Sequence, residues 1–104
     1  MIPKMMKEME RRALEFLNDK EKLAAVKADE AAKNKLIDYY EKQIVESEGF
    51  AEEIRLEYIR MQNVPPDNRN DRYPNVMQEI SGDYVFVKEH FIGVLKNVLE
   101  ALRS

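Results

Sequence analysis

Side chains that carry most enzyme chemistry are scarce in this chain of 104 residues, which has no cysteine and a single histidine, His90. Without cysteine there can be no disulfide, thiolate zinc site, iron–sulfur cluster or cysteine nucleophile. None of the serines (Ser47, Ser81 and Ser104) has the glycine-flanked strand-to-helix context of a hydrolase nucleophile. We therefore expect no catalytic residue, and take His90 as a boundary histidine on a helix. A general base working alone is its alternative role.

The spacing of the possible ligands does not predict a metal site either. Val87 and Gly93 stand three residues on either side of His90, so the Glu-x-x-His pair of di-iron bundles is missing. No two glutamates lie three residues apart, and the nearest pairs on one helix face are Glu48/Glu52 and Glu53/Glu57. Such pairs predict an acidic, solvated face, with no metal and no cofactor. A carboxylate-metal hydrolase is kept as a remote alternative.

Three methionines near the N-terminus are the first candidate for binding a protein partner. Met5, Met6 and Met9 offer flexible, polarizable thioethers, which suit a groove or a partner helix. The alternative is a helix that packs these side chains onto its own core.

Three residues of the segment 63–75 are the second candidate: Arg69, Arg72 and Tyr73. Connections of this length in a small domain are either functional or disordered, so a solvated linker is the alternative. Together with Lys4, Lys7, Arg11 and Arg12, the two loop arginines could also contact phosphate. The interleaved acidic residues and the net charge of −3 make nucleic acid the weaker hypothesis.

Helices must position these residues, because 36% of the chain is charged while glycine (3) and proline (4) are rare. An amphipathic helix is predicted at about 3–17, with Ile2, Met5, Met9, Ala13 and Phe16 or Leu17 on its apolar face. Asn18 and Glu21 have the spacing of a capping box, which predicts a break there. One continuous helix through this point is the rival interpretation.

A long helix is predicted over 19–62, with a bend or break near 28–35 or at Gly49 as the alternative. Its apolar stripe keeps a spacing of three or four residues across Gly49, which places this glycine inside the helix. The stripe consists of Leu36, Tyr40, Ile44, Ser47, Ala51, Ile54, Tyr58 and Met61.

A loop at 63–75 and a last helix at 76–103 complete the chain. Pro65 and Pro66 end the long helix near Gln62, and Asn75 with Gln78 resembles a helix cap. The second stripe passes Gly82 in phase and favours one helix, although a stop at Gly82 with a restart at Asp83 is the alternative. It consists of Met77, Ile80, Tyr84, Val87, Phe91, Val94, Val98 and Leu102.

We therefore predict a single all-α domain over 1–104, an antiparallel long helical hairpin plus an N-terminal amphipathic helix, resembling a three- to four-helix bundle. A straight helix over 19–62 would span about 66 Å, so we expect either a bend or completion by oligomerisation, with a dimer favoured. The predicted function is a small non-catalytic protein–protein interaction or assembly module. A small nucleic-acid-associated regulator is the alternative.

The predicted location is the cytoplasm, without membrane contact. No apolar run approaches the roughly 18 residues of a membrane span, and the N-terminus has no apolar stretch typical of a signal peptide. The missing cysteines are compatible with a reducing compartment.

Overall fold

Residues 2–104 are described by a computed structural model, and every regular element within them is helical. The predicted all-α class is therefore confirmed. The chain forms α1 (Lys4–Asn18), α2 (Lys20–Ala28), α3 (Glu30–Gln62), the 3₁₀ turn η1 (Pro66–Asn68), α4 (Tyr73–Val85), the π-helical segment η2 (Phe86–Phe91) and α5 (Ile92–Arg103).

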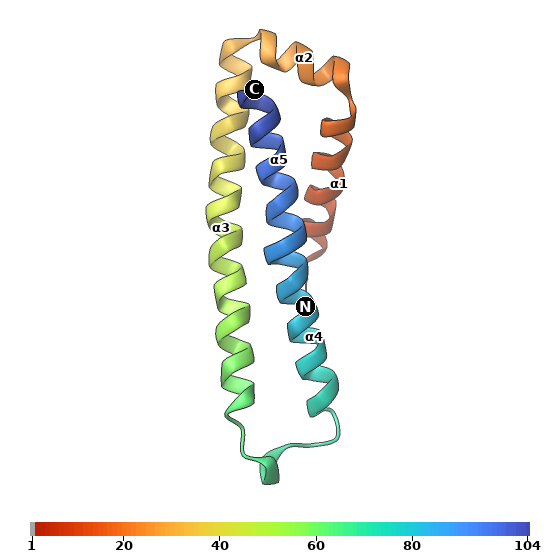
Figure 1. Cartoon of the computed structure of the whole chain (residues 1–104), viewed down its shortest axis with the longest axis vertical. Helices are drawn as coiled ribbons and strands as arrows, with labels where there is room; N and C mark the ends of the chain where they lie inside the picture. Colours follow the sequence, from red (N-terminus) through yellow and green to blue (C-terminus); the bar gives the residue numbers. More distant parts are fainter. Residues whose placement is uncertain (1) are drawn as a thin grey trace.

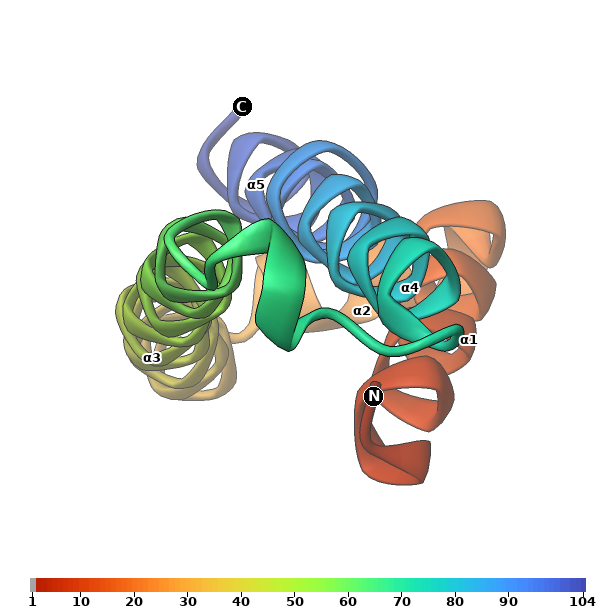
Figure 2. The same cartoon turned by 90° about the horizontal axis from the view of Figure 1, so that it is seen from below.

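The molecule is a long hairpin with one added helix on one face (Figure 1). Helix α3 runs its whole length, and α4, η2 and α5 return antiparallel beside it. Helix α2 crosses the end where α3 begins, and α1 lies along α5 on one side of the hairpin (Figure 2). The molecule measures 61 × 19 × 19 Å, and the 33-residue helix α3, about 50 Å long, accounts for most of its long dimension. Helix α1 is shorter than α3 and covers only the half of the hairpin that contains α5.

The two predicted stripes face each other and form the core. On α3, Tyr40, Ile44, Ser47 and Ala51 are buried, and the rest of its stripe is half-buried. The opposing core residues are Val87, Phe91, Ile92, Leu95, Val98, Leu99 and Leu102, joined by Ala13 and Phe16 of α1. The last helix carries the largest share of the buried side chains, because it is packed between α3 and α1.

The predicted helix over 19–62 is divided at Asp29, inside the interval where a bend or break was expected. The Asp29 carboxylate accepts a hydrogen bond from the backbone N–H of Ala32 (3.2 Å) and so caps α3. Gly49 lies within α3, and no break occurs there.

The predicted cap at the first corner is wrong by one residue. Asn18 is the last residue of α1, and Asp19 caps α2 by accepting a hydrogen bond from the N–H of Lys22 (3.1 Å). Both residue types cap well, and the side chain that reaches the free N–H group three residues on is that of Asp19.

The start of the last helix also differs from the prediction. Helix α4 begins at Tyr73, so Asn75 lies inside its first turn and the connection shortens to residues 63–72. Pro74 fits there because the first turn of a helix leaves its N–H groups without intrahelical acceptors.

No stop occurs at Gly82, so the alternative break there is wrong. The irregularity lies instead at η2, where the chain takes a wider π turn. Val87 and Phe91 both remain buried across this turn, and the apolar stripe therefore continues into α5.

Candidate interaction surfaces

The methionines of α1 line a groove against α3 and η2. Met6 and Met9 pack against the core, whereas Met5 is 73% exposed at the rim. The other lining residues are Pro3, Gln43, Glu46, Ser47 and Phe91. The expected apolar face of α1 is thus wrong at Met5, because the face runs through Met6, Met9, Ala13 and Phe16 and leaves Met5 at its margin. We call this surface the methionine groove.

Two of the three candidate residues in the loop hold the loop itself together. The Arg69 guanidinium donates hydrogen bonds to the carbonyl oxygens of Val64 (3.0 Å) and Gln62 (3.1 Å) and lies 4.4 Å from the centre of the Tyr73 ring. The Tyr73 hydroxyl donates to the carbonyl of Met61 (3.0 Å). The contacts to Met61 and Gln62 satisfy carbonyl groups in the last turn of α3, which have no partner within the helix, and the contact to Val64 holds the loop that follows. Arg72 is exposed beside them.

Two of the four basic residues of α1 are paired with acidic neighbours on the same helix. Arg11 forms ion pairs with Glu8 and with Glu15 (2.5 Å), and Arg12 lies 3.4 Å from Glu8. The hydrogen bond from Arg11 lowers the pKa of Glu8, and the charge of Arg12 lowers it further. Lys4 and Lys7 are exposed. This face of α1 therefore carries alternating charges rather than a basic patch.

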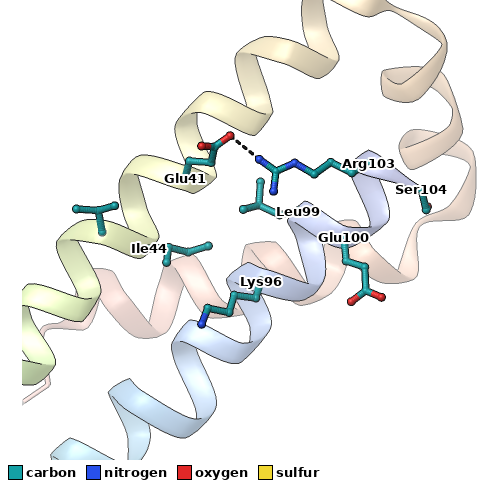
Figure 3. Close-up of a pocket in the computed structure, with 8 residues that line it drawn as sticks. Glu41, Ile44, Lys96, Leu99, Glu100, Arg103 and Ser104 are labelled. Carbon is teal, nitrogen blue, oxygen red and sulfur yellow. Dashed lines mark hydrogen bonds and ion pairs between the residues drawn. The ribbon is translucent and has the colours of Figure 1, made fainter.

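A second groove, between α3 and α5, was not predicted from the sequence (Figure 3). Buried Ile44 and Leu99 form its floor, and Val45 stands at its rim with 70% of its surface exposed. The carboxylate of Glu41 on α3 and the guanidinium of Arg103 on α5 form an ion pair of 2.6 Å across it. Its remaining lining residues are Lys96, Glu100 and Ser104. The available signal was Val45, an apolar residue that lies among Glu41, Glu48 and Glu52 on one side of the helix and outside the predicted apolar stripe.

His90 lies on η2 and is exposed, with its ring stacked near that of Phe86 at a centroid distance of 6.3 Å and an interplanar angle of 17°. Over residues 2–104, no three His, Asp or Glu side chains gather closely enough to hold a metal ion. None of the helices in this part of the chain is long and apolar enough to cross a membrane.

Comparison with known proteins identifies no relative of this chain. The chain matches no family model, and neither a curated protein nor a solved structure is significantly similar to it. Function has to be inferred from the grooves and charges of the molecule itself.

Proposed function

We propose that this protein is a small, non-catalytic protein–protein interaction or assembly module. One observation carries the proposal: Met5 is 73% exposed at the rim of a groove whose walls are Met6, Met9 and Phe91. An unbranched thioether exposed beside an apolar groove can repack around a partner side chain at little cost.

The chemistry of the methionine groove favours one kind of partner segment. Its floor is apolar, so it suits a leucine, methionine or phenylalanine side chain that projects from a partner helix. Glu46 is exposed at the α3 side of the groove and could pair with a basic residue next to that anchor. We therefore propose an amphipathic helix with an apolar anchor and a neighbouring lysine or arginine.

The nucleic-acid alternative has weaker support. Arg11 and Arg12 are paired with carboxylates, and Arg69 is engaged with the carbonyl groups of its own loop. Binding to phosphate would have to break these contacts or rely on the remaining candidate residues, Lys4, Lys7 and Arg72.

We also propose that the protein is cytoplasmic and self-associates, with a dimer favoured. The Cα radius of gyration is 17.6 Å, against about 13 Å for a compact domain of 100 residues. Within residues 2–104, no third helix lies over the half of the hairpin formed by α4 and the end of α3 (Figure 1). An elongated, thinly covered hairpin gains most from burying a face against another chain.

The contact surface can be tested by site-specific crosslinking in the native host. A photoreactive residue at position 5 should trap a partner that a residue at position 20, on α2, does not trap. The partner, once purified, should bind the Met5→Glu variant at least about tenfold more weakly than the wild type, because a charge at the rim must be desolvated. Equal binding by both forms, or equal trapping from both positions, would refute the methionine groove as the contact surface.

A further inference from the structure

The face of the hairpin opposite α1 carries an ordered arrangement of charges. On α3, Glu41, Val45, Glu48 and Glu52 follow one another at intervals of four, three and four residues, so they lie along one side of the helix. The facing edge of η2 and α5 carries basic residues, namely Lys88, Lys96 and Arg103. We call this surface the open face; one of its edges is mainly acidic and the other mainly basic.

The structure places acidic and basic residues of the open face at matching heights. The ion pair of Glu41 with Arg103 sets the register of the antiparallel helices. Glu48 lies seven residues after Glu41 on α3, and Lys96 lies seven residues before Arg103 on α5. Because the two helices are antiparallel, this register brings Glu48 level with Lys96. No ion pair joins Glu48 to Lys96 within residues 2–104. Lys96 instead lines the groove (Figure 3), which is also lined by Val45.

A longer-range charge interaction extends the pattern beyond this groove. The pKa of Glu52 is lowered mainly by its hydrogen bonds from Arg55, and the positive charge of Lys88 lowers it further. Lys88 therefore lies close enough to Glu52 for their charges to interact. Exposed apolar side chains accompany these charges along α3: Val45 (70% exposed), Leu56 (52%) and Ile59 (38%).

The open face is large enough to hold a second copy of the chain. The molecule measures 61 Å by 19 Å, an outline that exceeds the roughly 800 Å² per partner buried in a standard interface. Two copies stacked face to face would enclose the groove over Ile44 and Leu99 and cover Val45, as in a four-helix bundle.

Electrostatics select between the two symmetric ways of stacking these faces. A two-fold axis across the helices would set α3 on the partner's α3, which brings the mainly acidic edge against its own copy and the mainly basic edge against its own copy. A two-fold axis along the helices sets α3 on the partner's α5 at the same height, which brings acidic residues opposite basic ones. Like charges at an interface are costly, whereas opposite charges stabilise it and set its register.

We propose that two copies of this chain dock through their open faces about a two-fold axis parallel to the long helices, with Glu48 of each copy opposite Lys96 of the other. This inference rests on the proposed self-association and assigns its surface and geometry. Arg55 and Glu100 depart from the charge pattern. Arg55 is held by Glu52 on its own helix (2.6 Å), and Glu100 is exposed at the rim of the groove.

The test is sedimentation equilibrium on two single charge reversals, Glu48→Lys and Lys96→Glu, measured separately and mixed. Each variant alone should dimerise at least about tenfold more weakly than the wild type, because symmetry places like charges at two contacts. An equimolar mixture should recover the wild-type affinity, since the new lysine of one chain then faces the new glutamate of the other. Glu21→Lys and Lys20→Glu on α2 are the matched controls and should dimerise like the wild type.

The outcomes separate the surface from the self-association. A wild-type mass of 12.3 kDa at millimolar concentration would overturn both proposals. A wild-type dimer that neither reversal weakens would leave self-association standing and overturn the open face as its surface. Weakening of both variants without recovery in the mixture would overturn the pairing of Glu48 with Lys96. Circular dichroism of each variant checks that the helices are intact.

Discussion

Gly49 provides the sharpest test of the helical hairpin, because glycine is a poor residue for the middle of a helix. It lies near the centre of α3, its φ angle is not positive, and a Cβ atom added there would have no neighbour within 4 Å. Neither backbone strain nor a clash would therefore oppose alanine. The Gly49→Ala variant should gain the full difference in helix propensity, about 0.8–1 kcal/mol in the free energy of unfolding.

Urea unfolding followed by circular dichroism at fixed protein concentration measures this gain. The midpoint should rise without a change in slope, since the surface exposed on unfolding stays nearly the same. The melting temperature should rise by about 4–8 °C for each kcal/mol in a domain of this size. Gly82→Ala on α4, where added Cβ also meets nothing within 4 Å, should give a similar gain.

The reverse substitution makes a matched control. Ala24 is exposed in the middle of α2, so Ala24→Gly should lower stability by a comparable or smaller amount. If Gly49→Ala left stability unchanged or reduced it, the placement of Gly49 in an unobstructed helix would be wrong. The phase of the apolar stripe across this glycine would then have another origin.

Other substitutions test the core, a corner and an ion pair. Leu95→Ala removes a fully buried side chain and should lower the free energy of unfolding in urea by about 2–5 kcal/mol. Met5→Ala, at an exposed rim, should change it by less than about 0.5 kcal/mol. Similar losses for the two variants would contradict the described packing. Asp29→Ala should cost about 1 kcal/mol by the same measurement, since the N–H of Ala32 loses its acceptor, and no loss would refute that cap. Arg55→Gln should raise the pKa of Glu52 toward its ordinary value in an NMR titration. A carboxylate with a lowered folded-state pKa stabilises the fold above its unfolded-state pKa and loses this contribution as the pH falls through the folded-state pKa. The stability of Arg55→Gln should therefore decline less steeply toward acid pH, and an unchanged Glu52 pKa would contradict the ion pair.

Caps and corners show where sequence reasoning loses precision. Asn18 and Asp19 are both good capping residues, and a local pattern cannot tell which of the two side chains will meet the free N–H group. The same ambiguity misplaced the start of the last helix, where Pro74 could equally precede a helix or occupy its first turn. The π turn at η2 had no recognisable signal, because Val87 and Phe91 preserve an ordinary helical spacing.

The candidate surfaces were predicted only in part. The predicted apolar face of α1 is correct at Met9, but Met6 rather than Met5 is half-buried beside it. The roles of Arg69 and Tyr73 depended on how the loop folds back onto the end of α3, which no local pattern encodes.

The sequence by itself determined the class of the fold and its two long apolar stripes, because helical periodicity is a local property that survives single glycines such as Gly49. It also excluded every chemistry that needs cysteine. Only the tertiary structure decided that α1 covers one face and leaves the other open, and that Glu41 meets Arg103 across 62 positions of chain. Such pairings depend on where the corners at Asp19 and Asp29 direct each helix, and a small change in a corner moves a whole helix face.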